Sequence, residues 1–294
     1  RYTVTKDGYV VMSSETGVID IDPANISLHG RLEPGRMFLV DMEEGRIIED
    51  KEVKKLISSK YPYGEWLKEN LLPLKEIPYT RNITPVESEP FLKRLQAFGY
   101  TEEDIKTLIT PMSNLGKEAI GSMGTDTPLA VLSNKPQLLY NYFKQLFAQV
   151  TNPPLDGIRE EIVTDTSMSV GSDANIFNII PSHAKKLRIQ NPIISNEDLD
   201  KIKFIEHDDF KSKSVNALYN VKEGNNGLES SLKKLLSQVK KEVEDGANII
   251  IISDRGISKD IAPIPILLAC SFVHHGMMKL LSLIHISEPT RLAE

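Results

Sequence analysis

The 294-residue sequence contains a single cysteine, Cys270. One thiol excludes an intramolecular disulfide framework and a four-cysteine zinc or iron–sulfur site made by this chain alone. The sequence also lacks an excess of positive charge, since 35 lysines and arginines stand against 41 aspartates and glutamates, a formal net charge of −6. That balance argues against the broad phosphate-neutralising surface of a general nucleic-acid binder. We therefore predict a cytoplasmic protein with no nucleic-acid partner.

Long hydrophobic runs are missing as well. The longest two cover residues 248–253 and 264–273, well short of the ~20 apolar residues that cross a bilayer, so we expect no membrane partner. The chain opens on Arg1, with neither an initiator methionine nor a signal-peptide core, from which we expect a longer parent protein. What is present is 40% hydrophobic and 26% charged residues, typical of a soluble globular protein of about two domains.

The first fifty residues predict short strands separated by turns. Residues 36–41 and 46–48 are apolar runs on either side of a Glu-Glu-Gly turn, which indicates a hairpin. Asp50 is the predicted N-cap of the helix that follows. Three apolar residues share one face of this helix, namely Val53, Leu56 and Ile57. We expect that face to pack on the sheet.

Residues 61–90 contain five prolines. Proline lacks a backbone donor and biases the preceding residue toward extended conformations. This segment is therefore predicted to be a linker that wraps a surface, with one short helix around residues 66–71. We place a domain boundary near residue 80.

Helix signals follow the linker. Residues 101–104 have the form of a capping box, and residues 195–198 have the same polar pattern at the start of a second helix. Between them, residues 137–150 predict an aromatic-rich amphipathic helix. The second part of the chain is thus predicted to contain several helices.

A strand, a helix and a strand are predicted in succession after residue 214. The strand covers residues 215–219, the helix has apolar residues at helical spacing over 228–243, and the second strand is the all-apolar run 248–252. Strands in this order pair in parallel through a right-handed crossover. The predicted fold class is α/β, with a parallel sheet and flanking helices preceded by a β-rich piece.

Two polar residues follow the predicted strand 248–252. Asp254 and Arg255 stand at its carboxyl end, where open parallel sheets bind ligands. They are candidate ligand contacts. The alternative is that Asp254 caps the next helix or pairs with Arg255 to stabilise the loop.

A glycine-rich segment follows the linker. Gly116, Gly121 and Gly124 suggest a phosphate-binding loop, but Glu118 stands where such a loop needs Ser or Thr, and the spacing does not fit a dinucleotide fingerprint. Close backbone packing is the better explanation of the glycines. The polar side chains among them remain candidates for lining a passage: Ser122, Thr125, Asp126 and Thr127.

Two further groups of residues are interpreted as structural rather than catalytic. Cys270 and His274 lie four residues apart on one predicted helical face, yet a lone cysteine in an apolar run behaves as a small core residue. Glu160 and Glu161 are adjacent, so they diverge by ~100° on a helix and cannot address one bond. They are predicted to complement the dipole at a helix start.

Five separated blocks of the sequence are informative as strings: residues 29–47 (HGRLEPGRMFLVDMEEGRI), 91–105, 116–133, 142–163 and 253–275. They resemble glutamate synthase, either its large (alpha) subunit or the single-chain ferredoxin-dependent form. The blocks agree in order, and the resemblance covers nearly all of residues 1–279.

The resemblance implies a domain organisation. Residues 1–80 resemble the end of a class II glutamine amidotransferase domain, which has the α+β fold of N-terminal-nucleophile hydrolases. Residues 81–279 resemble the N-terminal part of the central domain, which is α/β and joins the glutaminase to the flavin domain. Residues 280–294 depart from the family and are expected to be a non-native tail.

The resemblance also implies a chemistry that this chain does not carry out alone. The family releases ammonia from glutamine and combines it with 2-oxoglutarate to form L-glutamate. The family's nucleophile is an N-terminal cysteine, whereas position 1 here is Arg1. FMN and an iron–sulfur cluster are implied for the parent only, so we expect no catalytic, cofactor or metal residue and no activity here. The implied partners are the remaining parent domains and a small NAD(P)H-oxidising subunit or ferredoxin.

What remains for this chain is a scaffold and a conduit. In the family, a tunnel carries ammonia between the two sites, and its walls must exclude bulk water. We expect one loop to form the tunnel junction, through Gly121, Ser122, Met123, Thr125 and Asp126; the alternative is a purely structural loop. The alternative to a glutamate synthase fragment is a non-enzymatic α/β binding module that uses Asp254 and Arg255.

Overall fold

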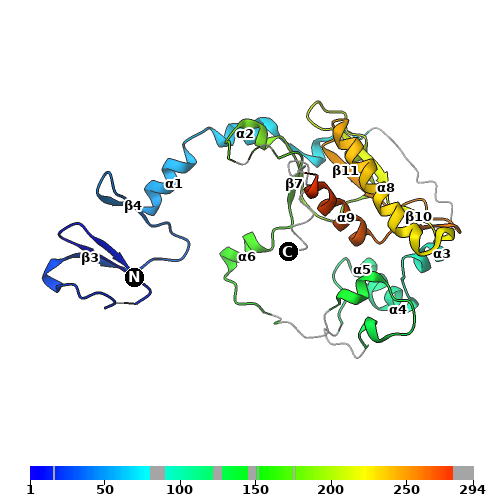
Figure 1. The fold of residues 1–294 in the computed structure, drawn as a ribbon, viewed down its shortest axis with the longest axis horizontal. Helices are drawn as coiled ribbons and strands as arrows, with labels where there is room; N and C mark the ends of the chain where they lie inside the picture. Colours follow the sequence, from blue (N-terminus) through cyan, green and yellow to red (C-terminus); the bar gives the residue numbers. More distant parts are fainter. Residues whose placement is uncertain are drawn as a thin grey trace. The chain divides into compact units, whose positions relative to one another are not determined.

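Residues 1–15, 17–79, 90–121, 128–144, 150, 152–173, 175 and 177–280 are described by the structure, a computed structural model. The chain divides into two units, Arg1–Glu69 and Asn70–Glu294 (Figure 1). Among the described residues, no helix is both long and apolar enough to cross a membrane.

The first unit combines two small antiparallel sheets with two helices. The strand β1 lies between β2 and β3 in one sheet, and β4 pairs with β5 in the other. The elements are β1 (Tyr2–Thr5), β2 (Val10–Met12), β3 (Ile26–Gly30), β4 (Leu39–Asp41), β5 (Arg46–Ile48), α1 (Asp50–Ser58) and α2 (Tyr63–Asn70).

The β4–β5 pair confirms the predicted hairpin. Leu39 lies opposite Ile48 and Asp41 opposite Arg46. The Asp41 carboxylate accepts the backbone N–H groups of Glu43 and Glu44, both at 2.8 Å, and so closes the turn. A local sequence signal was sufficient here because the turn carries its own hydrogen bonds.

The start and the packing of α1 both differ from expectation. Glu49 is the N-cap and Asp50 is the first helical residue. The Asp50 carboxylate instead accepts the backbone N–H of Met37 at 2.9 Å. Of the predicted apolar face only one side chain, Val53, is buried, while Leu56 and Ile57 are 58% and 56% exposed. Three-residue strands offer too little surface to cover the whole face.

The second unit begins inside the segment that was expected to be a surface linker. The strand β6 (Leu71–Pro73) lies in parallel against β8 (Lys186–Ile189), which pairs on its other side with β7 (Met168–Val170). Leu74 and Ile77 follow β6 and are buried. Pro73 is compatible with this pairing because it ends an edge strand. The linker prediction is therefore wrong for residues 71–77.

The predicted capping box is confirmed, and the helix that it starts is irregular. Thr101 and Asp104 exchange side-chain and backbone hydrogen bonds. The helix runs through α4 (Glu102–Asp104), a π-helical turn η3 (Ile105–Ile109) and α5 (Thr110–Leu115). Pro111 cannot donate to the carbonyl four residues before it, which accounts for the wide turn ahead of it.

The aromatic-rich helix predicted for residues 137–150 does not form in its described part. Residues Leu139–Phe143 make a 3-10 turn, η5, and Lys144 is extended. Residues 145–149 lie outside the described residues. The side chain of Leu138 packs against Gly99 and leaves no room there for a Cβ. Here a contact between segments remote in sequence accompanies a local structure that the helical spacing of apolar residues did not predict.

The parallel pairing predicted near the carboxyl end of the chain is present. The strand β9 (Ser212–Asn216) pairs in parallel with β11 (Ile249–Ser253), and the long helix α8 (Gly224–Glu244) lies between them in sequence. The expected strand 215–219 is in fact two strands, because Ala217, fully buried, separates β9 from β10 (Leu218–Asn220). In the part of the chain that the structure describes, sheets contain only two or three strands.

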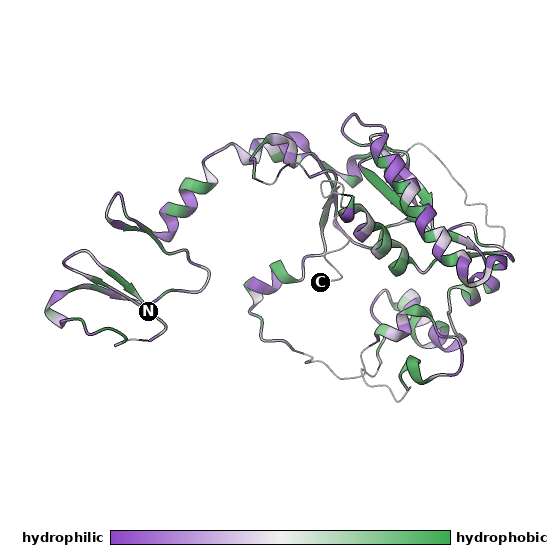
Figure 2. Ribbon diagram, in the orientation of Figure 1, coloured by the Kyte–Doolittle hydropathy of each residue, from purple (hydrophilic) through white to green (hydrophobic). Residues whose placement is uncertain are grey.

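Two hydrophobic clusters occupy opposite faces of β11. Ile250 and Ile252 pack against a cluster formed with α8 and α9 (Ile266–Lys279). Ile249 and Ile251 belong to a second cluster formed with α7 (Asn196–Lys203), β8 and the segment after β6. In Figure 2 the strands beside α8 are hydrophobic, whereas hydrophobic and hydrophilic residues alternate along α8 itself. The strand is thus buried on both faces, as its apolar sequence predicted.

The remaining elements are short. They are η1 (Pro23–Asn25), η2 (Leu74–Glu76), α3 (Phe91–Ala97), η4 (Ala130–Leu132), α6 (Gly157–Val163), η6 (Pro181–Ala184), η7 (Val221–Glu223) and β12 (Ile261–Pro263), which pairs antiparallel with β10.

Leu187→Ala is expected to lower the free energy of unfolding by about 2–5 kcal/mol, because its side chain is fully buried in the second cluster and its loss leaves a cavity. The matched control is Ile193→Ala, at a position that is 89% exposed, and it should change stability by no more than about 0.5 kcal/mol. Urea titration followed by circular dichroism measures both. Equal effects of the two substitutions would contradict this core assignment.

Candidate functional site

The carboxyl ends of β9 and β11 lie side by side. Asn216, the last residue of β9, is the register partner of Ser253, the last residue of β11. The backbone N–H of Ala217 donates to the carbonyl of Ser253 at 2.7 Å. Ligands of open parallel sheets bind outside this edge. The loop that starts with Asp254 and Arg255 therefore leaves the sheet where sequence reasoning expected it.

Within this loop, Arg255 is tied to a distant helix. Its Nη2 donates to Oδ1 of Asn196 at 2.7 Å, and Asn196 is the first residue of α7. Its backbone N–H donates to the Ser253 hydroxyl at 3.3 Å. Sequence reasoning missed Asn196, because a cap pattern locates a helix start without indicating what a remote arginine will bind.

The two structural alternatives for Asp254 are wrong among the described residues. The next helix, α9, begins only at Ile266, after Pro265, so Asp254 caps no helix. The side chain of Arg255 is bonded to Asn196 and forms no ion pair with Asp254. Asp254 is half-buried at the strand end and stays a candidate contact.

A groove opens beside this edge of the sheet. Its volume is about 480 Å³, and it lies along α8, next to β10 and Gly256. Leu218, Leu235 and Ile261 provide apolar surface in it. Gly256 adopts a φ of 99°, a left-handed conformation that favours glycine at this turn.

The glycine-rich segment is described only in part. Gly116 ends α5 with a φ of 61°, which is the ordinary helix-terminating role of glycine. Gly121 is exposed, and no atom of the described residues lies within 4 Å of the position that a Cβ would take, so close packing against the described residues does not explain it. The other four predicted tunnel residues lie outside the described residues: Ser122, Met123, Thr125 and Asp126. A cavity of about 620 Å³ is lined by residues that precede this segment in the sequence, such as Gly99, and by residues that follow it, such as Pro128.

Cys270 is not the core residue that its apolar surroundings predicted. It is an exposed free thiol on α9, whose buried stripe is Ala269, Val273 and Met277. Partial burial raises the pKa of the Cys270 thiol, which favours the protonated, less nucleophilic form. Within the described ranges, no group of three or more His, Cys, Asp or Glu residues is arranged to hold a metal ion.

The acidic residues near position 160 have a structural role. The Asp156 carboxylate caps α6 by accepting the backbone N–H groups of Ile158 and Arg159. Glu160 lies in the first helical turn, where a negative charge complements the dipole. The predicted helix-start interpretation fits this geometry.

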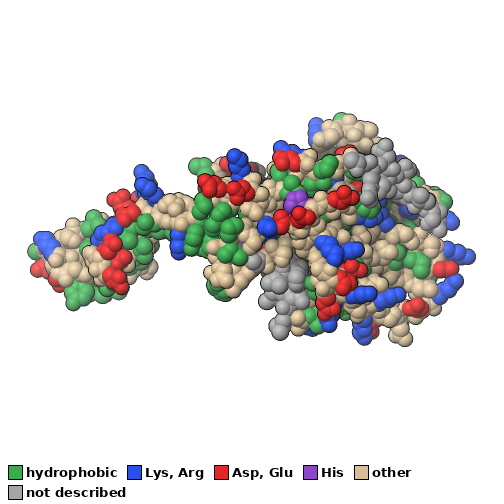
Figure 3. Space-filling model, turned by 90° about the horizontal axis from the view of Figure 1, so that it is seen from above, with side chains coloured by type: hydrophobic (Ala, Val, Ile, Leu, Met, Phe, Trp, Pro, Cys, Tyr) green, Lys and Arg blue, Asp and Glu red, His purple; other side chains and the backbone are tan. Residues whose placement is uncertain are grey.

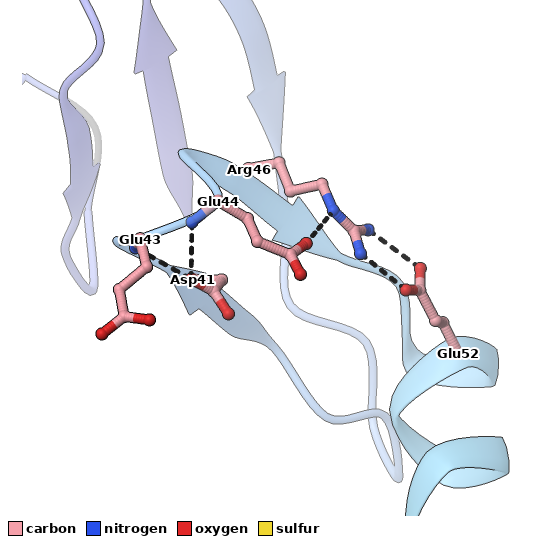
Figure 4. Close-up of polar contacts among 5 residues, drawn as sticks. All are labelled: Asp41, Glu43, Glu44, Arg46 and Glu52. Carbon is pink, nitrogen blue, oxygen red and sulfur yellow. Dashed lines mark hydrogen bonds and ion pairs between the residues drawn. The ribbon is translucent and has the colours of Figure 1, made fainter.

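An arginine-centred network in the first unit was not predicted (Figure 4). Arg46 donates two hydrogen bonds to the Glu52 carboxylate, at 2.9 and 2.7 Å, and one to Glu44 at 2.6 Å. The hydrogen bonds from Arg46 lower the pKa of Glu52, and the same contacts raise the pKa of Arg46. The network ties the hairpin to the first turn of α1.

On the face drawn in Figure 3, basic and acidic side chains are interspersed. No stripe of one sign stands out on that face. This distribution is consistent with the sequence-based argument against a phosphate-binding surface.

Two family profiles match the chain. The family described as glutamate synthase central domain matches residues 93–286, and the family of class-II glutamine amidotransferases matches residues 1–66.

Curated relatives match across both regions. The NADPH glutamate synthase large chain of Bacillus subtilis is 43% identical over 282 residues, which cover 95% of this chain and 18% of that protein. The NADH glutamate synthase of Schizosaccharomyces pombe is 38% identical over 290 residues, 95% of this chain and 14% of that protein. Ferredoxin-dependent glutamate synthase 2 of Synechocystis is 38% identical over 283 residues, which cover 95% of this chain and 18% of that protein. The chain thus spans less than a fifth of the length of these relatives.

Arg46→Ala is expected to raise the pKa of Glu52 back toward its ordinary value, because the hydrogen bonds that lower it are lost. Since the folded-state pKa of Glu52 is lowered, the contact stabilises the fold above the ordinary glutamate pKa and is lost as pH falls through the lowered value. NMR titration of the Glu52 carboxyl measures the shift. The control Arg36→Ala removes a guanidinium that pairs with Glu33 and should leave Glu52 unchanged. An identical titration curve in Arg46→Ala would refute the assignment.

Proposed function

The chain belongs to the glutamate synthase family, and we propose that it is the segment of a large subunit that joins the glutamine amidotransferase domain to the synthase part. The parent protein forms L-glutamate from 2-oxoglutarate and glutamine-derived ammonia. This segment serves it as a scaffold and has no activity alone.

The observation that carries this proposal is the position of residues 71–77. They follow the amidotransferase match, which ends at residue 66, and precede the central-domain match, which begins at residue 93. Rather than forming a loose tether, they supply the strand β6 and the buried residues Leu74 and Ile77 to the second unit. The junction is therefore anchored by pairing and burial, as a scaffold between two catalytic parts requires.

The assignment of a fold to each of the two domains rests on membership of the glutamate synthase family. We assign residues 70–279 to a parallel-sheet central domain and residues 1–69 to an N-terminal-nucleophile hydrolase domain, which moves the boundary from the expected residue 80 to the division between the two units. The parallel pairs β9–β11 and β6–β8, with α7, α8 and α9 beside them, support the first part. The central-domain match extends past Leu280 into the segment expected to be a non-native tail.

Cofactors and the electron source belong to other parts of the parent. The single cysteine, Cys270, does not suit an iron–sulfur cluster, and we place both FMN and the cluster outside this chain. Relatives differ in the donor that their names specify, which is NADPH, NADH or ferredoxin. The partner is accordingly a small NAD(P)H-oxidising subunit or ferredoxin.

The conduit role falls to the loop that begins at Gly121. It includes the predicted junction residues Ser122, Met123, Thr125 and Asp126. The hollow of about 620 Å³ that is lined by Pro128, the first described residue after this segment, supports this placement, because an ammonia passage needs free space that the rest of the parent can enclose.

A chimera tests the scaffold role. Residues 1–279 would replace the matching segment of the Bacillus subtilis large chain, and glutamate formation from glutamine and 2-oxoglutarate would be measured in the assembled enzyme. We expect a chimera that couples glutamine hydrolysis to glutamate formation. A well-folded chimera that hydrolyses glutamine without forming glutamate would overturn the proposal.

Paired substitutions in the chimera test the anchored junction. Leu74→Asp should cut coupled glutamate formation by about tenfold or more, because it places a charge in the second cluster. Leu92→Asp, at a position that is 65% exposed, is the matched control and should retain coupling. Equal coupling in the two variants would show that the junction needs no anchoring.

A further inference from the structure

The sheet of β1, β2 and β3 in the first unit has one apolar face. Residues directly opposite each other on antiparallel strands point to the same side of the sheet, so the register assigns each side chain to a face. The apolar face carries Tyr2, Val4, Val10, Met12 and Leu28. Gly30 lies on the same face, and the Tyr2 ring covers this glycine so closely that a Cβ would not fit.

The other face of the same sheet is largely polar. Thr3 lies opposite Val11 and His29, and the Thr3 hydroxyl and Nδ1 of His29 are hydrogen-bonded across the strands at 2.9 Å. Antiparallel sheets commonly have one face in water and one against a core. The residue pattern therefore assigns the Tyr2 face to a core.

The first unit supplies little of that core. Tyr2 packs against Phe38, with ring centroids 4.5 Å apart, but Met12 and Leu28 are 49% and 48% exposed. Among the described residues of this unit, only two apolar side chains are buried, Ile48 and Val53. Two buried apolar side chains are too few for an independent domain of this size.

A pocket continues the apolar face. Its volume is about 330 Å³, and its lining includes Tyr2, Phe38 and Ile47 together with charged side chains. Two further lining residues, Leu32 and Met37, are 42% and 41% exposed. Single exposed apolar residues are ordinary, whereas several beside a pocket mark an interaction site. A pocket of this kind can receive an apolar side chain from a covering segment.

The family assignment indicates what covers this surface. The match to class-II amidotransferases is confined to residues 1–66, and the chain spans only 18% of the Bacillus subtilis large chain. On the function proposed above, the remainder of the amidotransferase domain lies in parts of the parent outside this chain. That remainder needs an apolar surface of its own to join the first unit in one core.

We propose that the apolar face of β1–β3, with the pocket beside it, docks the preceding part of the parent's amidotransferase domain. The docked segment is apolar where it meets Met12 and Leu28, and one of its side chains enters the pocket. The first unit is thus the smaller part of a core that two parts of the parent polypeptide build together. Glutamine hydrolysis depends on this surface because the amidotransferase core is incomplete without it.

Adjacent substitutions in β3 test the docking in the chimera with the Bacillus subtilis large chain. Leu28→Asp should cut glutamine hydrolysis by about tenfold or more, because it places a charge in the joined core. Ser27→Asp adds the same charge at the neighbouring position, whose side chain points to the other side of the strand, and should keep at least about half of the hydrolysis. In the full chain alone, Leu28→Asp should leave the circular-dichroism spectrum unchanged, since Leu28 is already half-exposed there.

Equal glutamine hydrolysis in the two variants would overturn the docking proposal and leave the proposed function standing, because that function is judged from coupling in the unsubstituted chimera. Hydrogen–deuterium exchange gives a readout that does not need activity. The backbone amides of β1–β3 should exchange more slowly in the chimera than in the full chain alone, and equal exchange would contradict docking. A dimer of the full chain that Leu28→Asp dissociates would instead assign the face to a second copy and overturn the proposal.

Discussion

The burial of β11 on both faces is the constraint on which the second unit depends. Four isoleucines in succession alternate between the two hydrophobic clusters, because successive side chains of a strand point to opposite faces. The helices α8 and α9 complete one cluster, and α7 with β8 completes the other. A strand that is buried on both faces has its polar neighbours at or beyond its two ends, where Asn248 precedes β11 and Asp254 follows it. The loop of Asp254 and Arg255 and the groove along α8 lie at the carboxyl end.

Elements with local signals were predictable from the sequence. The capping box at Thr101, the serine cap at Ser195 and the β4–β5 hairpin all carry their stabilising hydrogen bonds within a few residues. The helix α8 was predictable from the spacing of its apolar residues, and the strand β11 from its uninterrupted apolar run. Each of these elements depends on residues that are close in sequence, so a short stretch of sequence is sufficient to predict it.

Features that depend on remote partners were not predictable. Residues 71–77 looked like a linker because nothing near them indicates pairing with β8. The hydrogen bond from Arg255 joins Asn196, which is 59 positions away, and the exposure of Cys270 depends on which stripe of α9 faces α8. Sequence similarity to glutamate synthases located the chain within its family, but it did not indicate these contacts.

The parallel pairing of β6 with β8 has a consequence for synthesis on the ribosome. Leu72 pairs with Leu187, so the partner strand is made 115 positions later in the chain. At ~5–20 residues per second, β6 waits roughly 6–23 s before its partner emerges. During that interval Leu74 and Ile77 have no core to enter. Until β8 is made, the nascent chain therefore displays a short apolar segment directly after the first unit.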